Sequence, residues 1–378
     1  MKNRRTIGTL LFLFCCIPAT AQANAGSVLM ISGYLHLTVG NFLIGLVEGG
    51  LLVWLFGARW PRAGKTMLVS NYLSAWSGGW ILRRFMLLTF PPDLYSARRF
   101  FWTGIVVAYL FTLLVEYPFV AYCLGKGRRS FRVVLKASLV VQTITYVALF
   151  GWYWTVSPRS LYTEARAVPP SEISFPAGLR LYYISADDGD VYRQALGENV
   201  SEHVFRLSSN WRNDRLFMRA APGEDGQWDL MALLEPGLEQ GSRSVVPVAD
   251  DVAAGVGVGE RDEEGIPQNP WGDARAMHLG DAESSDWEFR CGYWVAYSLV
   301  GTNERTGQHT WIRYETVFGH WYIGNATHLP GDLVVFQLGR DQICVWDVKQ
   351  RKVALLARGR GPVVVVPRGT ESPTSKPE

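Results

Sequence analysis

Four long apolar stretches in the first 156 residues constrain the fold of this chain more than any other feature. Each is nearly free of charged side chains, and the first and third contain one acidic residue each, Glu48 and Glu116. About 20 apolar residues suffice to cross a bilayer as a helix. The sequence therefore predicts a membrane α-helical domain over residues 26–157, with four transmembrane helices at 34–56, 66–82, 100–124 and 133–156.

The first 25 residues have the layout of a secretory signal peptide. They begin with basic residues, continue with an apolar stretch over 7–17, and end in small residues. An Ala-Gln-Ala sequence ending at Ala23 is the expected cleavage site. The alternative is an uncleaved anchor, although the apolar stretch is short for a span.

The basic residues of the short loops predict the orientation of the helices. Lys and Arg resist translocation, so the loops richer in them stay in the cytoplasm. The first and third loops carry seven basic residues and the middle loop carries four. We therefore expect a multi-pass protein of the inner (cytoplasmic) membrane with an extracytoplasmic carboxy-terminal domain, as the signal peptide also predicts. The seven are Arg59, Arg62, Lys65, Lys126, Arg128, Arg129 and Arg132; the four are Arg83, Arg84, Arg98 and Arg99.

The second and fourth apolar stretches resemble each other. LVSNYLSAW (68–76) aligns without gaps to LVVQTITYV (139–147), which matches Asn71 with Gln142 and Ser74 with Thr145. Each follows a helix that carries one glutamate, and an internal repeat of this kind indicates a duplicated unit. The sequence predicts a tandem repeat of two helical hairpins.

The polar residues within the predicted spans are the candidate functional residues. Ionised side chains are costly in lipid, so such residues face the bundle interior, where they pair or mark a pathway. We expect Glu48 to meet Asn71 and Ser74, and Glu116 to meet Gln142 and Thr145. Three roles are open: holding the bundle together, a proton or ion pathway, and a site for a small ligand.

The last 200 residues carry the pattern of an all-β domain. A Pro-rich linker over 158–177 leads to a β domain over 178–367, interrupted by an acidic loop at 250–286, and a disordered tail follows at 368–378. Strands that alternate apolar and polar residues around short turns predict hairpins. They lie in LRLYYISADDGDVYRQAL, DRLFMRAAPGEDGQWDLMALL, YWVAYSLVGTNERTGQHTWIRYETVF and DLVVFQLGRDQICVWDVKQRKVALLARG.

Two of these segments, YYISADDGDVYRQAL and VVFQLGRDQICVWDVKQRKVALLARGRGP, resemble blades of bacterial β-propeller repeats. The resemblance implies a partial or small propeller, since the domain is short for a closed ring; a β-sandwich is the alternative. The whole chain is similar to bacterial membrane proteins with a four-helix membrane domain and a propeller-like carboxy-terminal domain. That similarity implies no activity.

The chain divides into a basic and an acidic half, which excludes one class of partner. Residues 1–165 carry 16 Lys and Arg against 4 Asp and Glu, and the remainder carries 21 against 30. Nucleic-acid binding requires clustered basic side chains, so we expect none from the acidic β domain. The expected partners are the lipid bilayer and an extracytoplasmic protein.

No catalytic, cofactor or metal motif emerges from the sequence. GARWPRAGKT lacks the first glycine of a phosphate-binding loop, because Arg59 occupies that position. The histidines at 309, 320 and 328 fit no zinc spacing, and no cofactor is expected. Cys291 and Cys344 are candidates for a disulfide in an oxidising compartment, with two buried thiols as the alternative. We expect a non-enzymatic membrane-anchored β domain for binding or scaffolding; the alternative is a small transporter or proton-coupled channel that uses Glu48 and Glu116.

Overall fold

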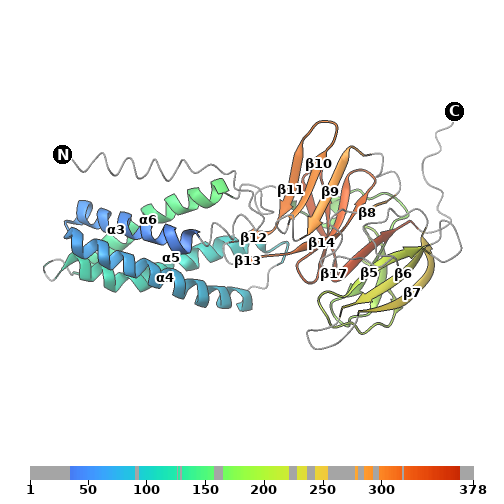
Figure 1. The fold of residues 1–378 in the computed structure, drawn as a ribbon, viewed down its shortest axis with the longest axis horizontal. Coiled ribbons are helices and arrows are strands. Elements are labelled where there is room, and N and C mark those ends of the chain that lie inside the picture. The colour runs from blue at the N-terminus through green and yellow to red at the C-terminus, as the bar shows by residue number, and fades with distance from the viewer. Residues whose placement is uncertain are drawn as a thin grey trace.

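The computed structural model places a helical bundle at one end of an elongated molecule and a β domain at the other (Figure 1). The predicted signal peptide (1–25), the tail (368–378) and most of the acidic loop lie outside the residues that it describes. Those residues are 35–89, 93–125, 127, 130–156, 165–220, 228–235, 243–253, 277–279, 285–292, 298–316 and 319–366.

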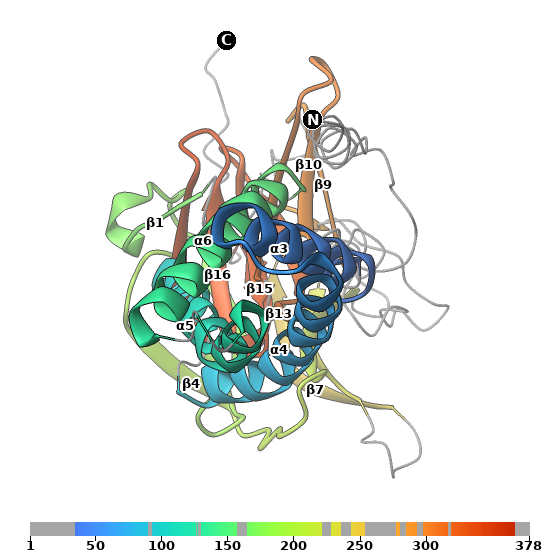
Figure 2. The same cartoon turned by 90° about the vertical axis from the view of Figure 1, so that its left-hand side faces the viewer.

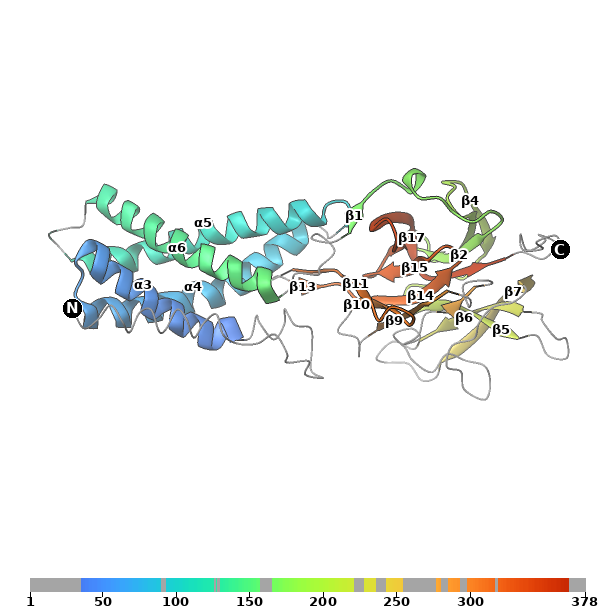
Figure 3. The ribbon, with the colours of Figure 1, turned by 90° about the horizontal axis from the view of Figure 1, so that it is seen from above.

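Four long helices run up and down the bundle. Helices that follow one another in the chain pack together, and α3 also contacts α6, which closes the bundle (Figure 3). The helix that contains the predicted second span (66–82) is longer than that span, because α4 begins at Trp60 and continues to Thr89. The helices are α3 (Asn41–Phe56), preceded by the π-helical turn η1 (His36–Gly40), α4 (Trp60–Thr89), α5 (Ala97–Leu124) and α6 (Phe131–Val156).

Three of these helical segments are long and apolar enough to cross a membrane: His36–Phe56, Ala97–Leu124 and Phe131–Trp152. Helix α4 is less apolar because it carries inward-facing polar residues such as Asn71 and Ser74, which are buried. Its outer face is nevertheless apolar at helical spacing. Val69, Leu73, Trp76 and Trp80 on that face are 50–73% exposed.

The bundle exposes apolar side chains and buries polar ones, which is the reverse of the arrangement in a water-soluble bundle. Among the described residues, every exposed large apolar side chain except Val200 lies between Leu35 and Val147. The polar side chains Asn41, Glu48 and Glu116 are instead buried inside it. A large contiguous apolar exterior marks a surface made for lipid or for another protein.

The carboxy-terminal part is all-β and built from antiparallel sheets, as predicted. Its largest sheet has the order β4-β3-β2-β17-β16-β15-β14-β8, with β1 beside β17; smaller sheets are β5-β6-β7, β11-β10-β9 and β12-β13. The described strands form no closed barrel. The strands are β1 (Arg166–Ala167), β2 (Arg180–Ser185), β3 (Val191–Ala195), β4 (Ser201–Phe205), β5 (Arg215–Ala220), β6 (Trp228–Leu234), β7 (Ser244–Ala253), β8 (Met277–His278), β9 (Trp287–Gly292), β10 (Ser298–Asn303), β11 (His309–Arg313), β12 (Glu315–Thr316), β13 (Gly319–His320), β14 (Ile323–Leu329), β15 (Leu333–Leu338), β16 (Gln342–Asp347) and β17 (Lys352–Val365).

All four predicted strand groups form antiparallel pairs: β2–β3, β5–β6, β10–β11 and β15–β16–β17. The long strand β17 pairs with β16 through its first half and with β2 through its second half. Gly361 lies at the register shift between Arg360 and Val363 in the β17–β2 pairing, at φ +57°, and a Cβ there would lie 2.4 Å from the Cα of Arg215. Only glycine fits this bend, which joins the last strand to the first hairpin.

Two predicted boundaries of the β domain need correction. The segment predicted as a linker (158–177) is part of the fold from Ala165 onward, because β1 pairs with β17 and Val168 and Ile173 are buried. The segment predicted as an acidic loop (250–286) begins within β7, which continues to Ala253. Main-chain pairing outweighs a local composition typical of loops in both places: β1 pairs with the distant β17, and β7 pairs with the preceding strand β6.

Candidate functional site

The two buried glutamates lie on opposite helices of the bundle. Glu48 on α3 and Glu116 on α5 are both 0% exposed. Helix α3 approaches α4 closely because Gly45 and Gly49 present no side chains: a Cβ at Gly49 would lie 2.9 Å from the Cα of Gly64. Small residues spaced by four allow such close contact between membrane helices.

Each glutamate accepts hydrogen bonds from α4 and from α6. Asn71 Nδ2 donates to Glu48 Oε2 at 2.5 Å, and Thr145 Oγ1 donates to Glu48 Oε1 at 2.9 Å. Ser74 Oγ donates to Glu116 Oε1 at 2.5 Å, and Gln142 Nε2 donates to Glu116 Oε2 at 2.6 Å. These six residues form a single polar layer in the bundle. Its four bonds join α3 to α4, α4 to α5, α5 to α6 and α6 to α3.

The structure brings together all six predicted residues but corrects two of the expected pairings. Asn71 meets Glu48 and Gln142 meets Glu116, as expected, whereas Ser74 and Thr145 each donate to the glutamate of the other hairpin. Residues three apart on a helix point about 60° apart around its axis. Because α4 packs between α3 and α5, Asn71 and Ser74 face different neighbours.

The two carboxyl groups are buried in the same polar layer. The four side chains that donate to them are neutral amides or hydroxyls. Two buried carboxylates in one layer without a cationic partner among these donors repel each other, so a proton on one of them stabilises the pair. A protonated carboxyl donates a hydrogen bond that a carboxylate lacks. The layer can therefore store a proton inside the bundle.

A second polar contact between α5 and α6 was missed by the sequence analysis. The Tyr109 and Thr143 hydroxyls are 2.9 Å apart, and those of Thr112 and Tyr146 are 2.8 Å apart. Thr112 lies one turn before Glu116, so its place on the same helix face was the available signal. The part-buried Thr112–Tyr146 contact extends the polar interior of the bundle beyond the layer, whereas Thr143 lies exposed on the bundle surface.

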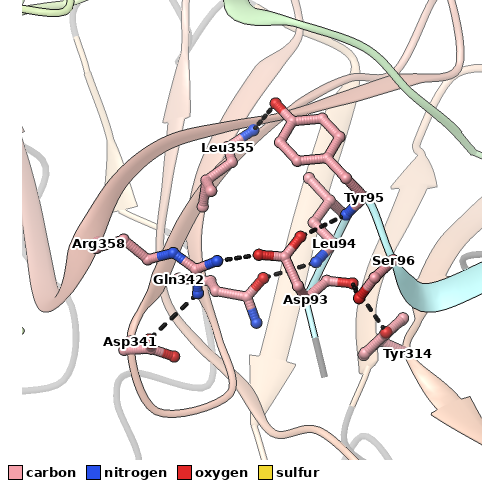
Figure 4. A network of polar contacts seen from close by, with 9 residues as sticks. All are labelled: Asp93, Leu94, Tyr95, Ser96, Tyr314, Asp341, Gln342, Leu355 and Arg358. Carbon is pink, nitrogen blue, oxygen red and sulfur yellow. Dashed lines mark hydrogen bonds and ion pairs between the residues drawn. The ribbon is translucent and has the colours of Figure 1, made fainter. Parts of the chain in front are cut away.

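The bundle is anchored in the β domain by the junction segment, Asp93–Ala97, which connects α4 to α5 (Figure 4). Leu94 and Ala97 are 2% and 4% exposed and belong to the same apolar core as Phe336. The Leu94 amide donates to Gln342 Oε1 at 2.7 Å. The junction segment is thus a component of the core of the β domain.

Polar contacts fix the position of the junction segment on three sides (Figure 4). The Tyr95 hydroxyl donates to the Val168 carbonyl at 3.2 Å and accepts from the Leu355 amide at 3.3 Å. The Tyr314 hydroxyl donates to the carbonyl of Asp93 at 3.3 Å. These contacts reach β17, the segment before β2, and the loop after β11.

An ion pair completes the junction. Arg358 Nη2 pairs with the Asp93 carboxylate, and Nη1 lies 3.2 Å from Asp341 Oδ2. Burial lowers the pKa of Arg358. Only one feature of the sequence indicated this contact: Asp93 is the only acidic residue between Glu48 and Glu116.

Of the two alternatives for Cys291 and Cys344, the structure shows two buried thiols that are not joined in a disulfide. Cys291 lies on β9 and Cys344 on β16, and both pack in the core that also holds Phe336. Burial raises the pKa of the Cys344 thiol. The two thiols therefore behave as small apolar side chains.

The described residues contain no group of three or more His, Cys, Asp or Glu side chains placed to hold a metal ion. The polar layer and the junction segment are therefore the candidate sites. Comparison of the chain with protein-family models, with curated proteins and with solved structures finds no match.

Proposed function

We propose that this chain is a non-enzymatic membrane protein whose β domain is held outside the cytoplasm and binds or organises an extracytoplasmic protein partner. One observation carries the proposal: the starts of α4 and α6, which carry basic residues, and the β domain lie at opposite ends of a bundle with an apolar exterior (Figures 1 and 3). Basic loops stay in the cytoplasm. The β domain is then on the outer side of the inner membrane.

Helix α4 acts as the fourth span in this proposal. Its outward residues Val69, Leu73, Trp76 and Trp80 suit lipid, and its polar residues face α3 and α5. The up-and-down order of the four helices places the junction segment and the end of α6 on the same side. The bond pattern of the polar layer also follows the predicted equivalence of Asn71 with Gln142 and of Ser74 with Thr145, which supports a duplicated hairpin.

The β domain serves as a platform built onto the bundle. The buried Leu94 and the Asp93–Arg358 ion pair hold it in place, so a bound partner keeps a defined position relative to the membrane. The closure of β17 onto β2 supports a partial or small propeller for this platform, with a β-sandwich as the alternative.

The orientation is tested by a reporter enzyme fused after Glu378. A reporter that is active only outside the cytoplasm should work there, and one that is active only in the cytoplasm should not. Activity of the cytoplasmic reporter at this position contradicts the proposal.

Partner binding is tested by photo-crosslinking in intact membranes. A photoreactive residue at Val200, which is 77% exposed on the β domain, should capture a reproducible protein partner. The same residue at Leu110, which is 57% exposed on the bundle, is the matched control and should capture lipid. Equal protein capture at both positions, or none at Val200, contradicts binding by the β domain.

A second candidate function, proton-coupled transport, rests on the burial of Glu48 and Glu116 in one polar layer inside the bundle. In liposomes that contain a pH-sensitive dye, the full-length protein should then raise proton flux. Glu48→Gln and Glu116→Gln should each reduce that flux to the level of empty liposomes, and Glu198→Gln on the β domain should not. Flux that persists in Glu48→Gln excludes this candidate.

A further inference from the structure

The bundle end opposite the β domain carries basic side chains without acidic neighbours in sequence. Arg59, Lys65, Arg132 and Lys136 are exposed there, at the first turns of α4 and α6 (Figure 2 views the molecule from this end). No acidic residue occurs from position 49 to 92 or from 117 to 163. This end therefore has a positive potential that attracts anions.

Exposed aromatic residues lie near the same end. Trp54, Trp60, Tyr122 and Phe131 are 71%, 50%, 50% and 66% exposed. Trp and Tyr concentrate where the hydrocarbon of a bilayer meets its head groups. The basic side chains are thus placed at head-group depth.

Arg62 occupies a distinctive position among these basic residues. Its guanidinium carbon lies 4.0 Å from the centre of the Tyr122 ring, and its Nε is buried without a hydrogen-bond acceptor in the part of the chain that the structure describes. Gly125, the residue that follows α5, lies beside the guanidinium: a Cβ there would lie 3.7 Å from Arg62 Nη1. An oriented guanidinium of this kind suits a bidentate bond to a phosphate group.

We propose that Arg62, flanked by Arg59 and Lys65, binds the phosphate of an anionic phospholipid of the cytoplasmic leaflet. Basic side chains beside transmembrane helices attract anionic lipids. The aromatic residues at the same depth favour a lipid over a soluble anion. The inference rests on the proposed membrane insertion, and it adds a specific lipid contact to it.

Native mass spectrometry of the full-length protein in detergent tests this contact. Phosphatidylglycerol or phosphatidylcholine with the same acyl chains is added in titration, and bound lipid is counted. We expect phosphatidylglycerol to bind at least fivefold more tightly, since one basic residue near the surface contributes about 1 kcal/mol. Arg62→Gln should remove most of this preference, and Arg62→Lys should restore part of it.

Arg206→Gln, which removes an exposed arginine of the β domain, is the matched control and should keep the preference. Equal preference in Arg62→Gln and the unchanged protein overturns the proposal. Displacement of the lipid by an equal concentration of inorganic phosphate also overturns it, because the site would then take a soluble anion. Failure of membrane insertion would appear separately, as extraction of the protein by alkaline carbonate.

Discussion

Ser74 and Thr145 each connect one helical hairpin to the glutamate of the other. This exchange makes the polar layer a closed ring of hydrogen bonds across four helices. Removing one donor should leave a buried carboxyl oxygen without its partner. Polar contacts between membrane helices contribute on average about 0.6 kcal/mol and at most about 1.7 kcal/mol.

A double-mutant cycle tests the exchange. Ser74→Ala combined with Glu116→Gln should show a coupling energy of about 0.5–1.5 kcal/mol. Ser74→Ala combined with Glu48→Gln should show clearly less, because these two side chains share no hydrogen bond among those found. The measurement is the free energy of unfolding in mixed detergent micelles. Coupling of Ser74 to Glu48 alone would restore the pairing expected from the sequence.

Asp332 gives a prediction for pH dependence in the β domain. It lies at φ +63° after β14 and accepts from Ser285 Oγ at 2.5 Å and from Lys349 Nζ at 3.1 Å. Burial alone would raise the pKa of this carboxyl, but the Ser285 and Lys349 contacts outweigh burial and lower it. A lowered folded-state pKa gives stability that is present above the unfolded pKa and lost as pH falls through the folded value.

Asp332→Asn should therefore lower stability at neutral pH and reduce the loss of stability below about pH 4. Asparagine tolerates the left-handed backbone, so the turn should persist. Thermal unfolding followed from pH 3 to 7 measures both effects, with Glu198→Gln as the surface control. If Asp332→Asn loses stability below about pH 4 as steeply as the unchanged protein, the Asp332 carboxylate contributes nothing to that loss.

At the scale of the elements, the contact between α3 and α4 depends on glycine. Gly49→Ala would place a Cβ 2.9 Å from the backbone of Gly64, so the helices must separate. Overpacking of this kind costs about 1–3 kcal/mol. Gly79→Ala on α4 meets no atom within 4 Å and should be neutral or stabilising, because alanine favours a helix over glycine. Unfolding in mixed micelles compares the two variants, and equal stability contradicts a tight α3–α4 contact.

The strand groups were predictable because their signals are local. The Asp-Gly turn between β2 and β3 sets its own register, and alternation of apolar residues selects the buried face. The start of α4 was missed because Arg62 and Lys65 made its first turns look like a loop. The pairing of β1 with β17 was missed because a two-residue strand has no periodicity.

For the whole molecule, the junction segment makes the bundle and the β domain a single unit. Leu94→Ala should cost about 2–5 kcal/mol, because the side chain is 2% exposed in the core of the β domain. Leu110→Ala, at a position 57% exposed on the bundle, is the matched control and should cost much less. Limited proteolysis of the full chain, followed by the rate of cleavage within the β domain, measures the difference. Equal rates would show that the junction segment is not part of this core.

The junction segment also restricts how the β domain can be transferred. A β domain fused to an unrelated anchor lacks Leu94, Ala97 and the acceptor that Asp93 offers to Arg358. Any such fusion that tests partner binding should therefore retain residues 93–97.

By itself, the sequence determined that apolar helices with inward polar stripes precede a domain of antiparallel hairpins. These properties depend on periodicity and turn chemistry, which act over a few residues. The tertiary structure alone decided that Thr145 donates to Glu48, 97 positions earlier, and that the Leu94 amide donates to Gln342, 248 positions later. It also left Cys291 and Cys344 as separate thiols. Contacts between distant segments depend on how whole elements pack, and no local pattern encodes that packing.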